Sequence, residues 1–455
     1  MNPGDEQALA VFDLGKTNAK LLGFGDRSGK PLFDERTVQR TILADGLRVL
    51  EHEPLFDWLN AALARVSERY RLSGLMVSTH GCTFALTAGD QLAAPILDYE
   101  QPVPPDIDRQ FAAEAPLFAE SFSPNLPGGL NVARHIYLRE QLTPDLFENA
   151  DAILNYPQFW NWLFTGAKVS EISSIGCHSH LWNPRADTFS SLVERRGWRP
   201  KFPPFRRAGE ILGETRIGAQ SVPVHNGVHD SNAALYYYRS LGYSDITLVS
   251  TGTWVIVFNQ ACPLDALDSS RDTLANVTVD RSPIATARFM GGREYEVIAA
   301  GSRATASHAT LQQAIDSGQF ALPSFAPGGP FPSRTGALRG PAPAGDEERA
   351  AIATLYVALM MDVVLEQLRS TNRIVVDGGL ARNRALLGIL AALRSGQSVS
   401  HNVAAEGTAM GAAALALEAH GKRQVFAPQI EEASALDLKG LSAYRETWRG
   451  LCLKA

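Results

Sequence analysis

Three short stretches of this sequence combine flexible turns with groups that could do chemistry. His229-Asp230-Ser231 places a carboxylate beside a histidine at the start of a predicted helix, where it can orient and deprotonate a substrate hydroxyl. Aspartate is also a preferred helix N-cap residue, and position alone favours that structural interpretation. The stretch therefore predicts either a general base or a cap, and other residues must decide between them.

A second stretch opens the chain with a small turn between two predicted strands, and its residues are Asp13, Gly15, Lys16, Thr17 and Asn18. The backbone N–H groups of such a turn can bind phosphate oxygens, and Asp13 can hold Mg²⁺ directly or through water. An ordinary hairpin explains the stretch equally well. A P-loop does not, because position 10 is Ala where that loop needs Gly and a strand follows where it needs a helix.

The third stretch, Thr251-Gly252-Thr253, is another small polar turn between predicted strands. One such turn is commonplace, but two at corresponding places suggest two phosphate-binding hairpins for one nucleotide. Asp377-Gly378-Gly379 leads from a strand toward Asn383 and a helix, where backbone can approach a ligand closely. A simple strand–helix turn accounts for that glycine pair as well.

The elements that must position these turns repeat along the chain. Strands are predicted at 8–13, 19–24, 32–38 and 75–79, and again at 245–250, 254–258 and 374–377. Helices are predicted at 54–70, 130–140, 159–164, 231–241, 347–369, 383–394 and 408–420. Gly291-Gly292 predicts a hairpin over 289–298. The repetition suggests a duplicated α/β fold with an N-terminal domain at 1–240 and a C-terminal domain at 241–455.

Composition excludes several classes of function. The 455 residues carry a net charge of −6, which argues against a general nucleic-acid binder because neutralising phosphates takes a basic surface. The sequence shows no signal peptide, and no uncharged apolar window long enough for a membrane span. Its four cysteines lie far apart, which fits a reducing cytoplasm rather than a disulfide framework.

Together the turns resemble the motifs of the FGGY carbohydrate kinases, most of all the branch containing rhamnulose and fuculose kinases. Asp13 to Thr17 is similar to the family's first phosphate motif, and Ser250 to Trp254 to its second. His229-Asp230-Ser231 resembles the His-Asp-Thr whose Asp is the catalytic base. The similarity continues through Tyr156 to Gly166, Glu171 to Ser174, Asp377 to Asn383 and Glu406 to Ala413, and so covers about residues 8–420.

Three positions depart from the family pattern. Lys16 stands where Thr or Ser is usual, and it could contact a phosphate or point to solvent. Gln158 replaces an Asp, and Glu100 falls where many members have the Asp of Trp-x-Asp-x-Arg. The last two lie in the half expected to hold the sugar, so they bear on the substrate. Cys177-His178-Ser179-His180 contains residue types that bind metals. Structural roles are favoured for them, because a zinc site would need further ligands at recognisable spacing.

The resemblance implies two duplicated actin-like, ribonuclease-H-like domains facing a central cleft, with sugar mainly on the first and ATP mainly on the second. It implies ATP-dependent phosphorylation of a ketose such as L-rhamnulose, L-fuculose or a related pentulose. Asp230 would be the base and Asp13 would position Mg²⁺. The implied ATP-binding residues are Gly15, Lys16, Thr17, Asn18, Thr251, Gly252, Thr253, Gly378, Gly379 and Asn383, with Asp13. The implied sugar-binding residues are His80, Gly81, Glu100, Gln158, His229 and Asp230.

The implied partner is a small sugar, with no nucleic acid and no membrane, in the cytoplasm; the oligomeric state, including a homodimer, stays open. Three alternatives remain. A polyol kinase of the same family would share every motif. An actin-like ATPase would hydrolyse ATP without a sugar, although His229-Asp230 argues against it. A non-catalytic sugar-binding protein would bind sugar without consuming ATP.

Overall fold

The computed structural model describes residues 6–404, 406–421, 426 and 429–454, which fold into two compact units. Unit 1 contains the chain up to Tyr243, Ala275–Pro283 and the segment that carries helix α14. Unit 2 contains Ser244–Leu274, Ile284–Glu406 and the segment with β22 and α15. The chain thus passes between units near the predicted boundary at 240, but two segments that the sequence assigns to the second half fold with the first. The binding roles expected of the two halves stay predictions.

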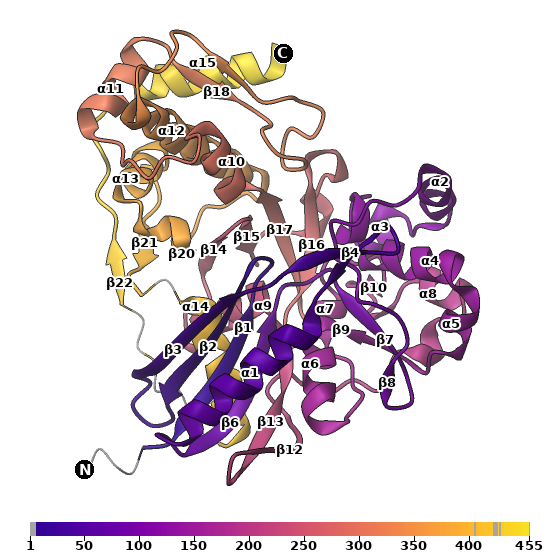
Figure 1. The fold of residues 1–455 in the computed structure, drawn as a ribbon. Helices are drawn as coiled ribbons and strands as arrows, with labels where there is room; N and C mark the ends of the chain where they lie inside the picture. The colour runs from indigo at the N-terminus through magenta and orange to yellow at the C-terminus, as the bar shows by residue number, and fades with distance from the viewer. Residues whose placement is uncertain (1–5, 405, 422–425, 427–428, 455) are drawn as a thin grey trace. The chain divides into compact units, whose positions relative to one another are not determined.

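Unit 1 is built on a sheet with the strand order β12-β13-β6-β1-β2-β3 (Figure 1). β1 pairs antiparallel with β2 and parallel with β6, and β6 pairs parallel with β13. Every residue of β1 is buried, as expected for a central strand covered on both faces. The carboxyl ends of β1, β6 and β13 therefore lie at one edge of the sheet. The strands are β1 (Ala8–Leu14), β2 (Asn18–Gly25), β3 (Pro31–Val38), β6 (Leu72–Thr79), β12 (Ile211–Ile217) and β13 (Gln220–His229).

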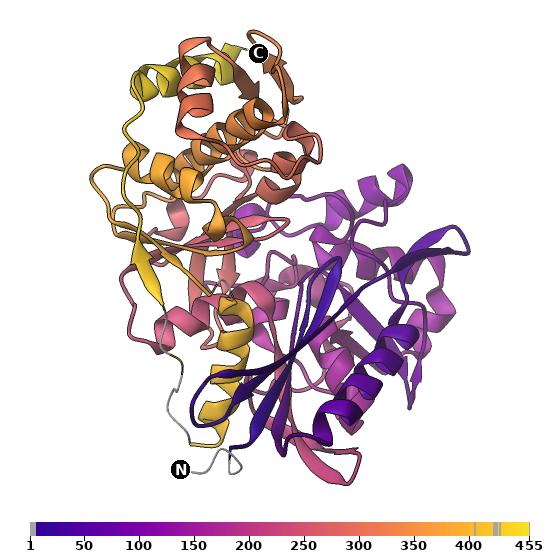
Figure 2. The same cartoon turned by 60° about the vertical axis from the view of Figure 1, so that its left-hand side comes forward.

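Helices pack against this sheet from distant parts of the chain. They are α1 (His52–Ser67), α6 (Tyr156–Thr165), α9 (Asp230–Ser240) and α14 (Gly407–Ala419). α14, gold in both views, lies against β1, β6 and α9 (Figures 1 and 2). α9 and α14 approach so closely that a Cβ on Gly411 would lie 1.8 Å from the carbonyl oxygen of Ala233. This glycine explains why the late Gly407–Ala419 segment can join the first unit.

The rest of unit 1 forms smaller elements around a second apolar cluster, which includes Phe84, Phe111, Ile136 and Trp198. These elements are β4 (Thr41–Ala44), β5 (Leu47–Leu50), β7 (Phe84–Ala88), β8 (Gln91–Leu92), α2 (Pro105–Glu114), α3 (Phe118–Ser121), α4 (Val132–Leu142), α5 (Pro144–Asn149), β9 (Ala152–Asn155), α7 (Ile172–Ile175), β10 (Trp182–Asn183), β11 (Thr188–Phe189) and α8 (Ser191–Arg195). They bring the residues around Asp98 and Glu171 into the same unit as Asp230.

Unit 2 repeats the strand arrangement, because its strands follow the order β17-β15-β14-β20-β21-β22. β14 pairs antiparallel with β15 and parallel with β20, and β20 pairs parallel with β21. β14 thus corresponds to β1 and β20 to β6, which confirms the predicted duplication of the fold. The strands are β14 (Ile246–Thr251), β15 (Val255–Asn259), β17 (Pro283–Phe289), β20 (Arg373–Gly378), β21 (Val399–Asn402) and β22 (Ile430–Glu432), with a separate pair β18 (Phe320–Leu322) and β19 (Ala337–Arg339); β16 is Thr273–Val277.

The predicted hairpin over 289–298 is wrong. β17 ends at Phe289, and Gly291–Ile298 forms helix α10. A Cβ on Gly292 would lie 2.1 Å from the carbonyl oxygen of Gly252, and one on Gly291 would lie 2.5 Å from Val255. The glycine pair therefore serves the close approach of α10 to the β14–β15 turn, a tertiary requirement that resembles a turn signal in the sequence.

The core of unit 2 surrounds helix α12 (Asp346–Gln367), flanked by α11 (His308–Asp316), α13 (Arg384–Leu393) and α15 (Leu441–Lys454). Within the described part of the chain, α12 is the one helix that meets the length and composition of a membrane span. In its most apolar window 89% of the residues are buried inside the protein, which is typical of a core helix.

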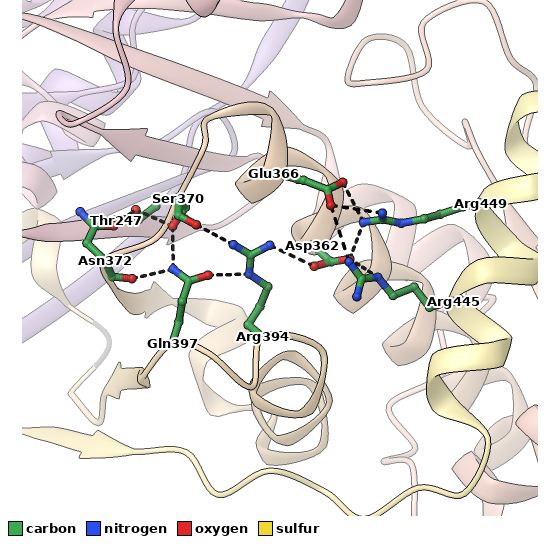
Figure 3. Close-up of polar contacts among 9 residues, drawn as sticks. All are labelled: Thr247, Asp362, Glu366, Ser370, Asn372, Arg394, Gln397, Arg445 and Arg449. Atoms are coloured by element: carbon green, nitrogen blue, oxygen red, sulfur yellow. Dashed lines mark hydrogen bonds and ion pairs between the residues drawn. The ribbon is translucent and has the colours of Figure 1, made fainter.

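A buried ion cluster fastens α15 to this core helix (Figure 3). The fully buried Asp362 of α12 forms ion pairs with Arg445 at 2.8 Å and Arg449 at 2.7 Å, both from α15, and with Arg394, which follows α13, at 3.4 Å. Arg394 also donates to the carbonyl of Ser370, which lies beside Thr247 of β14. Three arginines gathered on one buried carboxylate make Asp362 a stability determinant of unit 2.

Candidate active site

Three sequence-predicted residues meet at the carboxyl edge of the unit 1 sheet. Asp13 lies next to the end of β1, His80 directly follows β6, and Asp230 directly follows β13. Strand register aligns them, since Leu14 and His229 both pair with Thr79 of β6. The His80 N–H also donates to the carbonyl of Leu14 at 2.8 Å. Ligands of α/β sheets bind at such carboxyl edges, so the topology favours a site here.

Asp230 is the first residue of α9, and His229 takes the N-cap position. The Asp230 side chain is 29% exposed and accepts hydrogen bonds from Ser231 N at 2.6 Å and Ser231 Oγ at 3.1 Å. Burial raises the pKa of Asp230 to about 6, although His80 and the Ser231 bonds act in the opposite direction. An accessible carboxylate with a raised pKa is a stronger base than an ordinary aspartate and still mostly deprotonated at neutral pH.

His229 supports this carboxylate in its neutral form. Burial lowers the pKa of His229 to about 4. Asn232 Nδ2 lies 3.3 Å from His229 Nδ1, and Nε2 lies 3.2 Å from Asp230 Oδ1. Nδ1 therefore faces an amide donor, and Nε2 lies between Asp230 Oδ1 and Cys177 Sγ, which is 3.7 Å away. Asn232, three residues beyond His229 on the same helix, is a site residue that the sequence interpretation missed.

His80 contributes a neutral imidazole to the same edge. Its Nδ1 contacts the carbonyl oxygen of Gly81 at 2.8 Å, and its ring packs against Tyr99 and Tyr156. Burial lowers the pKa of His80, with the Gly81 carbonyl and Asp230 opposing that shift. Its buried Nε2 has no hydrogen-bond partner among the described residues, so it is available to a ligand hydroxyl.

Gly81 lets the two histidine-bearing segments approach. A Cβ at Gly81 would lie 2.9 Å from His229 Nε2 and 3.5 Å from Cys177 Sγ. The predicted pair His80-Gly81 is therefore placed directly beside His229-Asp230. Any larger side chain at position 81 would push against the ring that contacts Asp230.

The Lys16 side chain of the first turn does not point to solvent but contacts charged and aromatic residues. Its ammonium forms an ion pair with the fully buried Asp98, lies 3.9 Å from Glu100 and sits 4.5 Å from the centre of the Tyr99 ring. Burial acts to raise the pKa of Asp98, but Lys16, the Glu100 N–H and Thr41 outweigh it, and the pKa lies below its ordinary value. Lys16 therefore links the turn to the segment that contains Glu100, and its predicted phosphate contact stays a prediction.

Asp13 is almost buried beside β6. Lys20 Nζ lies 3.7 Å from Asp13 Oδ2, and in-register pairing places Asp13 opposite Ser78. The buried Ser78 hydroxyl lacks a hydrogen-bond partner within the described residues. A carboxylate oxygen beside a spare hydroxyl suits Mg²⁺, which typically takes one or two protein carboxylates and completes its shell with waters and substrate phosphates. No group of three His, Cys, Asp or Glu residues in the described chain forms a metal cage.

The second turn is built from backbone and glycine. Gly252 N donates to the carbonyl of Trp254 at 2.8 Å, and Gly252 and Thr253 are exposed. Thr251 Oγ1 donates to the carbonyl of Asp377 at 2.5 Å and accepts from Leu380 N at 3.0 Å. Parallel pairing of Thr251 with Gly378 brings the two predicted ATP-binding segments to one edge of the unit 2 sheet.

The backbone at this edge is open enough for a ligand to contact it directly. A Cβ on Gly252 would meet its nearest described atom at 4.0 Å, and one on Gly379 would meet none within 4 Å. Asn383 caps α13 by accepting from Leu386 N at 3.0 Å, so its side-chain oxygen serves the helix. The structure therefore brings Thr251, Gly252, Thr253, Gly378 and Gly379 together and gives Asn383 a helix-capping contact at the neighbouring helix start.

Gln158 takes a different place from the other predicted sugar-binding residues. It is fully buried, and its amide donates to Asn226 Oδ1 and to the carbonyl of Gly227, both at 3.0 Å. It thus supports the end of β13 from α6, and its predicted sugar contact stays a prediction. Glu100, in contrast, is partly exposed within the Lys16 cluster.

The Cys177–His180 segment serves packing and backbone contacts. His178 Nδ1 contacts the carbonyl of Leu130 at 2.7 Å, and His180 Nε2 contacts that of Ser123 at 3.0 Å. Cys177 Sγ lies 3.7 Å from His229 Nε2. The segment therefore borders the site through Cys177, while its two histidines contact the backbone of the loops that contain Leu130 and Ser123.

Comparisons with known proteins agree with this geometry. Residues 243–424 match the model of the carbohydrate kinase FGGY C-terminal domain. A crystal structure of a carbohydrate kinase from Novosphingobium aromaticivorans is 33% identical, with a TM-score of 0.85 and 99% of each chain covered. Xylulose kinase from Rhodospirillum rubrum is 17% identical (TM-score 0.78, 98% of each chain), which supports the fold alone. Gluconate kinase from Lactobacillus acidophilus is 13% identical (TM-score 0.79), covering 99% of this chain and 97% of that one. Curated protein sequences give no significant match.

Proposed function

This chain belongs to the FGGY family of carbohydrate kinases, and we propose that it transfers the γ-phosphoryl group of ATP to a hydroxyl of a neutral ketose, with Asp230 as the general base. Membership makes it an ATP-dependent phosphotransferase with the family's two actin-like, ribonuclease-H-like domains. The base, the metal ligand and the sugar are the proposed parts. The observation that carries them is the meeting of Asp13, His80 and Asp230 at one sheet edge.

The base acts on the sugar hydroxyl. Asp230 accepts the hydroxyl proton as that oxygen attacks the γ-phosphorus, and the His229 ring packs beside the carboxylate with Nε2 3.2 Å from Oδ1. Because Nδ1 of the neutral His80 ring donates to the Gly81 carbonyl, Nε2 accepts a hydrogen bond from a neighbouring sugar hydroxyl. Phosphoryl transfer depends on positioning and charge stabilisation, so these neutral imidazoles orient the substrate without adding charge.

Each unit offers one turn to phosphate oxygens. The N–H groups of Gly15 and Gly252 close their own turns by donating to Asn18 and Trp254, so the neighbouring backbone N–H groups at Lys16, Thr17 and Thr253 bind phosphate oxygens. Gly378 and Gly379 border the adenosine. Mg²⁺ would be held by Asp13, directly or through water, and would neutralise charge on the phosphates when bound. This allocation explains how a protein with a net charge of −6 binds an anionic nucleotide without a basic surface.

The charge around the proposed sugar position favours a neutral substrate over a sugar acid. Asp98, Glu100 and Asp230 bring three carboxylates to this unit. The two nearby cations, Lys16 and Arg48, are both engaged with Asp98 and Glu100. These two cations balance Asp98 and Glu100 and leave the charge of Asp230 uncompensated, so a sugar carboxylate beside Asp230 would meet like charge, which costs binding energy. L-Rhamnulose, L-fuculose and related pentuloses fit this requirement, and so does a polyol.

A coupled ADP-release assay over a panel of ketoses, polyols and gluconate tests the proposal. We expect one ketose to stimulate ADP release strongly, and gluconate to give no stimulation above the sugar-free rate. Preference for a polyol would place the chain with the polyol kinases instead. Strong turnover of gluconate, or equal ADP release with and without sugar, would contradict the proposal.

A further inference from the structure

A buried acid lies behind the proposed base. Glu171 is fully buried in unit 1 and precedes the short helix α7. Its carboxylate accepts from Ser173 N at 3.0 Å, Ser174 N at 3.3 Å and Ser173 Oγ at 2.5 Å. Burial of an acidic side chain is costly unless its hydrogen bonds are satisfied, and burial raises the pKa of Glu171 to about 7 against these bonds. Such a residue calls for a reason beyond capping one helical turn.

Ser173 connects this acid to the site. The backbone N–H of His229 lies 3.2 Å from Ser173 Oγ, and a backbone N–H can only donate. The Ser173 hydroxyl therefore accepts from His229 and must send its own proton elsewhere, which it does toward Glu171 Oε2. Glu171 thus sets the direction of the hydroxyl, and the hydroxyl holds the peptide N–H that immediately precedes Asp230.

The end of β13 needs this support. Its pairing with β6 shifts register between His225 and Val228, so the ladder is irregular just before the site. Side chains hold the segment instead, since Gln158 donates to the Gly227 carbonyl and Asn161 Oδ1 accepts from Gly227 N at 2.7 Å. Ser173 continues this series at His229, the last residue before α9 begins.

We propose that Glu171 and Ser173 are positioning residues for the kinase reaction, because together they hold the backbone N–H of His229, the residue directly before Asp230. This inference rests on the proposed role of Asp230 as base. Neither residue contacts Asp230 itself; they act through the backbone N–H of His229. A phosphoryl transfer that depends on the placement of its base is sensitive to displacements of about 1 Å, so loss of the bond slows turnover more than it weakens binding.

The chain offers a matched control at the next residue. Ser174 is also buried on α7, but its hydroxyl has no hydrogen-bond partner among the residues described. Ser173→Ala and Ser174→Ala therefore remove the same atom from the same helix, and only the first breaks the link to His229. We expect S173A to lower kcat about tenfold, with KM for ATP within about twofold of wild type, and S174A to stay within about twofold in both.

The acid limb of the kcat/KM profile separates positioning from folding. The groups that face Asp230 are His229 on β13, and His80 and Cys82 after β6. None of these groups is substituted in S173A. A shift in the pH of the acid limb therefore reports a displaced Asp230 carboxylate. A smaller folded fraction would instead lower kcat/KM equally at every pH. If S173A does not fold, Ser173→Cys keeps the size while weakening both hydrogen bonds, and we expect the same fall in kcat.

The positioning role would be overturned if S173A and S173C had the same kcat and the same acid limb as the S174A control. Asp230→Asn measured alongside distinguishes this failure from that of the proposed function. If D230N is inactive while S173A behaves like S174A, the base stands and only the positioning role is wrong. If D230N keeps wild-type turnover, the proposed base itself is wrong.

Discussion

The two hairpins that open the halves of this chain share a topology but differ in charge. The β1–β2 turn carries Asp13 beside Lys20, and Lys16 in an ion pair with Asp98. The β14–β15 turn carries no ionisable side chain, and Thr251 secures it through backbone atoms of Asp377 and Leu380. A duplicated scaffold has thus placed the side-chain charges at its first turn and backbone recognition at its second. We therefore expect side-chain chemistry from the first turn and backbone contacts from the second.

Among changes within the two turns, the largest expected effect tests whether metal chemistry belongs to the first turn alone. Asp13→Ala should lower kcat by about 10²-fold or more, because it removes the carboxylate proposed to hold Mg²⁺. Thr253→Ala in the second turn should change the KM for ATP and leave the Mg²⁺ dependence unchanged. Initial rates across a Mg²⁺ titration measure the Mg²⁺ dependence of both variants. An unaltered Mg²⁺ dependence in D13A would contradict the proposed difference between the two turns.

A second test concerns the glycines that support the turns. Gly378 has a φ of 89°, and a Cβ there would lie 1.9 Å from the carbonyl oxygen of Thr251. Gly378→Ala should therefore cost about 3 kcal/mol in the free energy of unfolding and weaken ATP binding. Gly15→Ala meets its nearest described atom at 3.5 Å and should fold normally. Thermal unfolding of both variants checks this, and equal stabilities would contradict the backbone-built second turn.

Lys16→Met tests the ion pair of the first turn. Losing the ammonium leaves Asp98 buried with fewer partners, so we expect a loss of about 2 kcal/mol in the free energy of unfolding at pH 7. The pKa of Asp98 is depressed in the folded protein, so its stabilising contribution is present above its unfolded pKa and fades as pH falls through the folded value. Urea unfolding should show the wild-type advantage shrinking at acid pH, below the ordinary value of 3.8. A pH-independent difference would point to packing instead.

The smallest effect is the pH dependence of turnover. A base with a pKa of about 6 predicts that kcat/KM falls about tenfold per pH unit below that value. The same raised pKa means that Asp230 destabilises the fold as pH rises through 6, since its folded pKa lies above the unfolded one. Rates from pH 5 to 8 should show the acid limb, and a flat profile would argue against an Asp230 base.

Much of this architecture could be predicted from the sequence. Apolar runs at 8–13 and 245–250 correctly indicated the central strands, because strands buried on both faces are apolar throughout. Gly291-Gly292 led to a wrong hairpin prediction. A glycine that is needed because a carbonyl oxygen packs closely against it cannot be told in the sequence from one that a turn needs. The loop-borne polar groups are harder to predict still. The Lys16–Asp98 pair spans 82 positions, and no local pattern reveals it.

The candidate site divides in the same way. Asp13 and His80 could be proposed because one ends and the other follows a predicted strand, and parallel strands bring their carboxyl ends together. Asp230 could be proposed from its place at the start of a predicted helix and from its resemblance to the family's His-Asp-Thr, although the strand before it was not predicted. Asn232 and Ser173 could not, because their roles depend on hydrogen bonds to His229 that only the packed structure defines. Gln158 was expected among sugar contacts, yet the structure gives it hydrogen bonds to Asn226 and Gly227.

The central claim is that Asp230 takes a proton from a sugar hydroxyl. Asp230→Asn keeps the size of the side chain and removes its basicity, so the most direct measurement is sugar-dependent ADP release by D230N, with ATP affinity measured on the same sample. We expect turnover to fall by at least about 10³-fold while ATP binds with wild-type affinity and the fold is at least as stable at pH 8 as in the wild type, because the buried charge is removed. Turnover within tenfold of wild type, with ATP bound normally, would contradict the account.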